Sequence, residues 1–152
     1  MIRSSGKIGV FGGSFDPPHS GHLEISKIAI KKLSLAKLYW CVTKKNPFKN
    51  KTLFSLSERI KQSKNITKKI KKIKIKYFDK KIKSTNTIDL IKYLNKINKK
   101  SSFFLIIGSD NLINFHKWKK WKLLTELTEI VVFSRKDYDI KAKKSVIVKK
   151  VK

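Results

Sequence analysis

Residues 7–25, with the sequence KIGVFGGSFDPPHSGHLEI, constrain this chain more than any other stretch. A short apolar run at 8–11 predicts a buried strand, and two glycines and a proline-containing turn follow it. His19 and His22 then stand where an apolar pattern at helical spacing begins, so both can face the same pocket. A strand, a glycine turn and a helix N-terminus together favour phosphate binding, because free backbone N–H groups and the positive end of the helix dipole face the anion.

The sequence GSFDP at 13–17, followed by HSGH at 19–22, resembles the signature of the nucleotidylyltransferase superfamily, whose members share a Rossmann-like fold and an HxGH motif. Within it, the proline before the first histidine and several later segments resemble the bacterial nicotinate-nucleotide adenylyltransferases. The resemblance covers about residues 7–138. It implies that the two histidines, His19 and His22, are catalytic. It also implies contacts with ATP or substrate in the preceding segment, at Gly12, Gly13, Ser14 and Phe15.

The composition is that of one folded domain over residues 1–152, with a hydrophobic fraction of 40%. Cys41 is the single cysteine, so an internal disulfide is excluded and a reducing compartment suits the chain. No apolar run approaches the roughly 20 residues of a membrane span, and the polar N-terminus does not resemble a signal peptide. We therefore expect a cytoplasmic protein without a membrane partner.

The charge balance is strongly basic, with 38 Lys and Arg against 10 Asp and Glu and a formal net charge of +28. Such a charge is compatible with a nucleic-acid partner. However, only three of the basic residues are arginines, and arginine is the usual residue for nucleic-acid recognition. The abundance of lysine, isoleucine and asparagine is also typical of a compositionally biased genome. We predict no dedicated nucleic-acid partner, and the sequence leaves an oligomer open.

The middle of the chain alternates strand and helix patterns. Residues 37–43 predict a second strand, and a capping-box sequence at 55–58 starts a helix over about 56–65. Isoleucine and tyrosine alternate with lysine at 73–77, which predicts a strand with one wet face. The basic loop after the second strand resembles a family segment beside the nucleotide site. There Lys49 either meets substrate phosphate or is a solvated lysine, and the residues leave both open.

The sequence STNTI at 84–88 precedes a helix with apolar residues at 88, 91, 94 and 97. It resembles a family segment with two threonines, which implies that Ser84 and Thr87 contact the substrate. Lys83 stands where some members have an aromatic residue. Helix capping is the alternative for both hydroxyl residues, and it is compatible with substrate contact.

Residues 102–107 predict the most apolar, central strand of a parallel sheet. Gly-x-Asp at 108–110 and Phe-x-x-Trp at 115–118 resemble the family again. The resemblance implies that Gly108 and Asp110 line the ribose region and that Trp118 stacks on the pyridine ring. Core packing is the alternative for two tryptophans on one helix face, and we favour it for Trp121 only. His116 lacks a family counterpart, and we expect it to be exposed.

The last part of the chain departs from the family pattern. A strand is predicted at 129–133 and another at 145–148. Arg135 and Tyr138 match a family segment, which implies that Arg135 binds substrate, whereas Lys136 and Asp137 replace Pro-Gly. The late Ser-Ser-Thr-x-Ile-Arg motif that helps to hold the ATP phosphates has no counterpart. A fragment, a naturally short enzyme and an impaired one all remain open.

The predicted fold is α/β, a Rossmann-like doubly wound parallel sheet of five to six strands with helices on both faces. The resemblance implies transfer of the adenylyl group of ATP to nicotinate mononucleotide in NAD biosynthesis, with Mg²⁺ carried on the ATP phosphates. Two alternatives remain. One is another HxGH enzyme such as pantetheine-phosphate adenylyltransferase, and the other is an inactive basic module that binds nucleotides or RNA. A zinc site lacks support, because one cysteine and no further ligand pair accompany the histidines.

Overall fold

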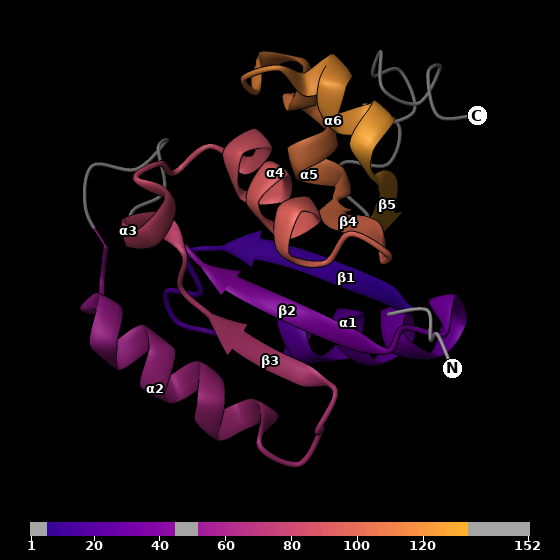
Figure 1. Cartoon of the computed structure of the whole chain (residues 1–152). Coiled ribbons are helices and arrows are strands. Elements are labelled where there is room, and N and C mark those ends of the chain that lie inside the picture. Colours follow the sequence, from indigo (N-terminus) through magenta and orange to yellow (C-terminus); the bar gives the residue numbers. More distant parts are fainter. Residues whose placement is uncertain (1–5, 45–51, 134–152) are drawn as a thin grey trace.

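Alternating strands and helices build a single parallel sheet in the computed structural model, which describes residues 6–44 and 52–133. The five described strands lie in the order β3-β2-β1-β4-β5 (Figure 1). The strands are β1 (Lys7–Gly13), β2 (Lys37–Val42), β3 (Ile73–Lys76), β4 (Ser102–Gly108) and β5 (Glu129–Phe133). The helices are α1 (Ser20–Leu33), α2 (Leu56–Thr67), α3 (Asp79–Ile82), α4 (Thr87–Ile97), α5 (Ser109–Ile113), the 3-10 helix η1 (Phe115–Lys117) and α6 (Trp121–Leu127).

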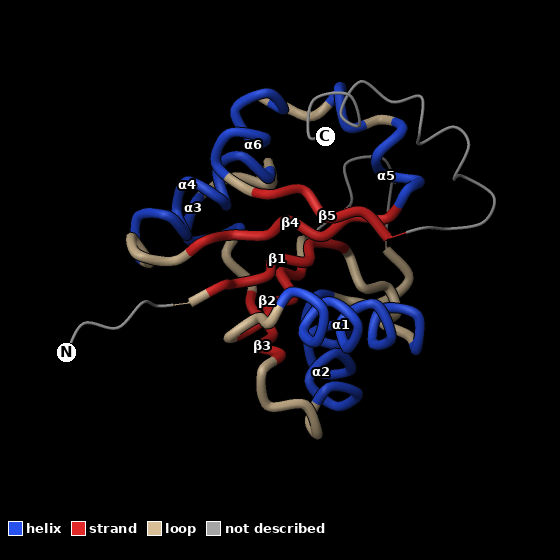
Figure 2. The backbone as a smooth tube through the Cα atoms, turned by 90° about the vertical axis from the view of Figure 1, so that its right-hand side faces the viewer, coloured by secondary structure: helices blue, strands red, loops and turns tan. Residues whose placement is uncertain are grey.

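Helices cover both faces of the sheet, because successive side chains of each strand point to opposite faces (Figure 2). Val10 of β1 belongs to the core cluster that α4, α5 and α6 complete. Its neighbour Phe11 belongs to the second cluster, which includes residues of α1 and α2. The strands are apolar on both faces for this reason, as the continuous run in β4 illustrates. The predicted fold class is confirmed.

The order of the strands creates a switch point at β1. This strand pairs with β2 on one side and with β4 on the other, so the chain winds outward in two directions from it. Ligands in open α/β sheets bind at such a point, beyond the carboxyl ends of the strands. The segment that follows β1 is therefore where the topology places a binding site.

Several predicted boundaries differ from the structure. Gly12 and Gly13 were expected in a turn, but they extend β1 and pair with Cys41 and Val42 of β2. The second predicted helix begins as expected, where the Ser55 hydroxyl accepts a hydrogen bond from the Glu58 N–H at 3.1 Å, and α2 continues to Thr67. The strand predicted at 145–148 lies outside the described residues.

The two tryptophans expected on one helix face are a further correction. Trp118 has extended backbone angles, φ −74° and ψ 142°, and lies between η1 and α6. Trp121 is the first residue of α6. An extended residue and a left-handed one, Lys120, interrupt the helical pattern that the sequence suggested, so the two rings do not share a helix face.

Across 6–44 and 52–133, the structure contains no helix that combines the length and hydrophobicity of a membrane span.

Candidate active site

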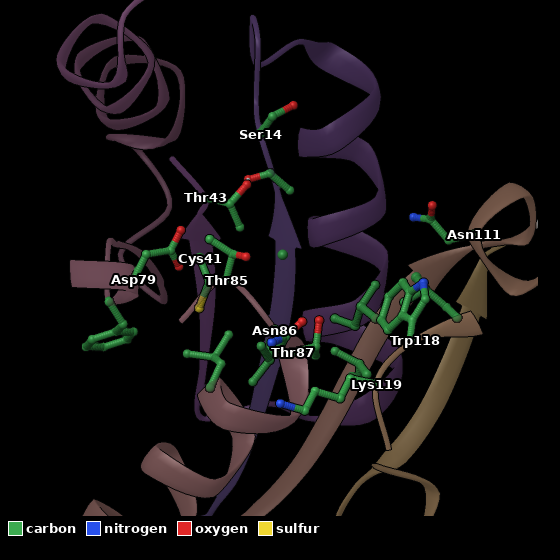
Figure 3. Close-up of a pocket in the computed structure, with 18 of the residues that line it drawn as sticks. Ser14, Cys41, Thr43, Asp79, Thr85, Asn86, Thr87, Asn111, Trp118 and Lys119 are labelled. Atoms are coloured by element: carbon green, nitrogen blue, oxygen red, sulfur yellow. The ribbon is translucent and has the colours of Figure 1, made fainter. Parts of the chain in front are cut away.

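A cavity of about 410 Å³ lies at the carboxyl ends of β1, β2 and β4, on the sheet face that α4 to α6 cover (Figure 3). Its apolar wall includes Val10, Leu105 and Ile107 from the strands. Its polar wall comes from loops and helix ends, and it includes Ser14, Thr43, Thr85, Asn86, Thr87 and Asn111. An apolar pocket with a few convergent polar groups at a switch point is typical of a ligand site.

Gly12, Gly13 and Ser14 line this cavity at the end of β1, as the phosphate-binding prediction requires. The next residue differs from the prediction. Phe15 has a left-handed backbone, with φ 48°, and its ring is buried against Trp40 in a stack with 4.7 Å between the centroids. Its side chain is a core residue on the α1 side and does not line the cavity, so any contact with substrate would come from its backbone.

The histidine pair forms a reciprocal cap at the start of α1. The Gly21 N–H donates to His19 Nδ1 at 3.0 Å, and the His19 N–H donates to His22 Nδ1 at 3.1 Å. Because each Nδ1 accepts a hydrogen bond, the proton of each neutral ring is assigned to Nε2, which becomes a donor. The ring centroids are 3.9 Å apart. Neither ring lines the cavity; the glycine segment that does line it leads to them.

The N-terminal end of α4 supplies three cavity residues, Thr85, Asn86 and Thr87. Thr87 was predicted at the site, whereas Thr85 and Asn86 were missed. Ser84 does not line the cavity. Its hydroxyl donates to the Asp89 carboxylate at 2.6 Å and accepts from the Asn86 N–H at 3.0 Å, so Ser84 closes the turn that begins α4. The polar run of four residues was the available signal, and only the turn decided which of them point into the cavity.

Trp118 lines the cavity and rests on the buried ring of Phe115, with 4.9 Å between the centroids. Trp121 also packs on Phe115, with 6.3 Å between the ring centroids, but it does not line the cavity. Of the two tryptophans, Trp118 is therefore the one placed where a ligand could reach it, and its predicted stacking role stays a prediction. Lys117 and Lys119 add positive charge beside it, and sequence reasoning did not single them out. His116 is exposed, as expected.

The remaining predicted residues are Gly108, Asp110, Lys49 and Arg135. Gly108 is the residue before α5 and does not line the cavity, and Asp110 lies in the first turn of α5. Lys49 and Arg135 lie outside the described residues, and the roles predicted for them stay predictions.

A half-buried carboxylate at one end of the cavity was not predicted. Asp79 and Cys41 lie there, on the opposite side from Trp118 in Figure 3. The Asp79 carboxylate accepts a hydrogen bond from the Lys44 N–H at 2.9 Å; burial raises the pKa of Asp79, and this hydrogen bond opposes the rise. Burial, together with the nearby charge of Asp79, raises the pKa of the Cys41 thiol to about 12. The thiol is therefore protonated at neutral pH and is a poor nucleophile.

The described residues contain no group of three or more His, Cys, Asp or Glu side chains that could hold a metal ion. Protein ligands for a structural or catalytic metal are thus not assembled in this part of the chain.

A parallel sheet wound outward from β1, with a glycine segment and paired histidines after that strand, is an architecture that binds nucleotides at the switch point of its sheet. The cytidylyltransferase-like family model matches residues 10–151, and the chain belongs to this family. Within it, the chain groups with the nicotinate-nucleotide adenylyltransferases, as its relatives show.

A probable nicotinate-nucleotide adenylyltransferase of Pelagibacter ubique (strain HTCC1062) is 52% identical over 140 residues, which cover 92% of this chain and 77% of the relative. A probable nicotinate-nucleotide adenylyltransferase of Ruegeria sp. (strain TM1040) is 35% identical over 138 residues, which cover 91% of this chain and 72% of the relative. The solved Plasmodium falciparum nicotinic acid mononucleotide adenylyltransferase, complexed with APC, has a TM-score of 0.77 at 19% identity and covers 92% of this chain and 71% of its own. At that identity the solved structure supports the shared fold.

Proposed function

We propose that this chain transfers the adenylyl group of ATP to nicotinate mononucleotide and releases pyrophosphate. The observation that carries the proposal is the histidine pair at the start of α1, reached through a glycine segment that lines a cavity containing Trp118. The relatives bear the same activity in their names. The site residues assigned below are part of this proposal.

The chemistry requires little proton transfer from the protein. An oxygen of the mononucleotide phosphate attacks the α-phosphorus of ATP, the new P–O bond forms, and the bond to the β-phosphate oxygen breaks. The attacking phosphate is already anionic near neutral pH, so a general base is not needed. Positioning and charge stabilisation supply most of the rate for such a step.

Each group of residues has one task in this proposal. The Nε2–H groups of His19 and His22 donate to phosphate oxygens as negative charge moves toward the leaving pyrophosphate. The backbone of Gly12, Gly13 and Ser14 approaches the phosphates closely. The indole of Trp118 stacks on the pyridine ring at the other end of the cavity. Lys117 and Lys119 contribute positive charge beside the anionic mononucleotide.

Mg²⁺ fits this site as a companion of ATP. The described residues assemble no cage of acidic ligands, and Mg²⁺ commonly binds substrate phosphates with few protein ligands. Bound there, it would neutralise the charge of the leaving pyrophosphate.

Cytoplasmic location also stays our prediction, and it rests on the single free cysteine.

Pyrophosphate release by the purified chain tests the function. The assay contains ATP and Mg²⁺, and compares nicotinate mononucleotide, nicotinamide mononucleotide and phosphopantetheine as acceptors. Turnover with a preference for the nicotinate acceptor is expected. Preference for phosphopantetheine would reassign the chain to another branch of the superfamily. Salt-dependent binding of random RNA without turnover would indicate the basic binding module instead.

A further inference from the structure

Arg59 is a buried cation whose side-chain hydrogen bonds within the described residues all reach backbone carbonyl oxygens. It lies on α2 and is 1% exposed. Its guanidinium donates to the carbonyls of Phe54 at 3.1 Å, Ser14 at 2.8 Å, Thr43 at 2.7 Å and Lys44 at 2.7 Å. A buried guanidinium is stable only when its donors are paired, and here the acceptors come from three separate segments.

Two of those segments form the rim of the cavity. Ser14 follows β1, Thr43 follows β2, and both residues line the cavity. Pairing of β1 with β2 ends at Gly13 and Val42, and just beyond it the Thr43 N–H donates to the Gly13 carbonyl at 2.9 Å. Arg59 Nη1 donates to both Ser14 and Thr43, so one nitrogen ties the two segments together where the sheet no longer does.

Two carboxylates extend the same network, because each accepts from the N–H of a residue whose carbonyl Arg59 contacts. The Lys44 N–H donates to Asp79, and its carbonyl accepts from Arg59. The Phe54 N–H donates to Asp16 at 2.8 Å, and its carbonyl also accepts from Arg59. Lys44 and Phe54 are thus each held through both the N–H and the carbonyl, and Arg59 is the donor common to them.

We propose that Arg59 is a positioning residue for adenylyl transfer, because its guanidinium fixes the Ser14 and Thr43 segments relative to each other. The inference rests on the proposed function. Arg59 does not touch the cavity itself, so it acts through the carbonyls that it holds. A lysine could not replace it, because its donors all sit on one compact nitrogen, whereas Arg59 reaches the four carbonyls from three guanidinium nitrogens.

Arg59→Lys tests whether the Arg59 guanidinium acts as a clamp, that is, whether it holds the Ser14 and Thr43 segments together. The variant keeps the positive charge and loses the planar guanidinium. We expect kcat to fall about tenfold or more, with KM for ATP within about threefold, because small displacements of positioning groups slow the chemical step. Lys61→Met is the matched control, since Lys61 is an exposed cation on the same helix. It should leave kcat unchanged.

Chemical rescue distinguishes the hydrogen bonds of the guanidinium from the packing of the Arg59 side chain. In Arg59→Ala, added ethylguanidinium should restore part of kcat, whereas ethylammonium should not. If Arg59→Ala does not fold, the Arg59→Lys result decides alone. Unchanged kcat in Arg59→Lys, or equal rescue by ethylguanidinium and ethylammonium, would overturn the proposal.

Amide hydrogen exchange without substrates tests the clamp independently of the reaction. Arg59→Lys should speed exchange at the Thr43 and Lys44 amides and leave the amides of β4 unchanged. If the wild-type chain transfers no adenylyl group, the proposed function fails, and this local change would still support the clamp. Uniformly faster exchange would show that Arg59 has only a general role in stability. Unchanged exchange at every amide would show that Arg59 does not hold these segments.

Discussion

Gly21 illustrates how one residue type is required by the geometry of the histidine pair. An added Cβ at this position would lie 2.8 Å from His19 Cε1 and 2.9 Å from His19 Nδ1, closer than real Cβ atoms approach. The His19 ring needs that space to accept the Gly21 N–H and cap α1. The HxGH motif therefore requires glycine at this position, because the His19 ring packs directly against it at the start of the helix.

His22 is the residue whose loss should affect the reaction most. We expect His22→Ala to lower kcat about a hundredfold or more, as the loss of a donor to transition-state charge does. His19→Ala should act in the same direction. Steady-state pyrophosphate release measures both. His116→Ala is the control, because this exposed histidine lies outside the cavity lining. Near-normal turnover of both motif variants would remove the catalytic assignment.

Trp118 and Trp121 form a matched pair for testing the pyridine subsite. Both contact Phe115, but only Trp118 lines the cavity. Stacking on an aromatic side chain is worth about 1–3 kcal/mol, so Trp118→Ala should raise KM for nicotinate mononucleotide about tenfold. Trp121→Ala should leave that KM within about twofold, although it removes core packing. Equal KM values in the two variants would argue against the stacking role.

At the scale of elements, α1 and β2 are joined through a buried polar link. The Trp40 indole N–H donates to the Ser26 hydroxyl at 2.8 Å, and that hydroxyl donates to the His22 carbonyl at 2.8 Å. Trp40 also stacks on Phe15, whose ring centroid lies 4.8 Å from that of His22. The second strand thus fixes the helix turn that carries a proposed catalytic histidine.

Ser26→Ala should destabilise the fold by about 1–3 kcal/mol, because it leaves the buried Trp40 N–H without its acceptor. Ser63→Ala is the control. Ser63 is equally buried, yet its hydroxyl has no hydrogen-bond partner in the part of the chain that the structure describes. Its removal should be neutral or slightly stabilising. Urea unfolding measures both free energies. A Ser26→Ala variant as stable as the Ser63→Ala variant would contradict the role of the link.

At the scale of the whole molecule, the charge of +28 sets the long-range field. Both proposed substrates are anions, so the field should speed their encounter with the site. We expect kcat/KM for ATP to fall about tenfold between roughly 20 and 300 mM salt, while kcat changes little, because screening weakens attraction and not the chemical step. Initial rates over a salt series give this dependence. A salt-independent kcat/KM would mean that the lysine surface does not steer substrate.

The sequence by itself determined the order of the five described strands, the helices α1, α2 and α4, and the place of the histidine pair. These are properties of near neighbours: apolar periodicity defines each element, and turn residues define the breaks between them. Parallel strands bring their carboxyl ends to one edge, so a site at Gly12 to Ser14 could be anticipated. Thr87 and Trp118 were expected there from the family resemblance. The extension of β1 through its glycines could not be anticipated, because pairing with β2 decided where the strand ends.

Only the tertiary structure decided which distant groups meet. Arg59 reaches Ser14, 45 residues away, and Asp79 reaches Lys44, 35 residues away, and no local pattern links either pair. Ser84 and Phe15 show the same limit, since a turn directs the first to Asp89 and core packing takes the second to Trp40. A sequence specifies the residue types that are available, but burial and loop closure choose their partners, because these depend on every element packed around them.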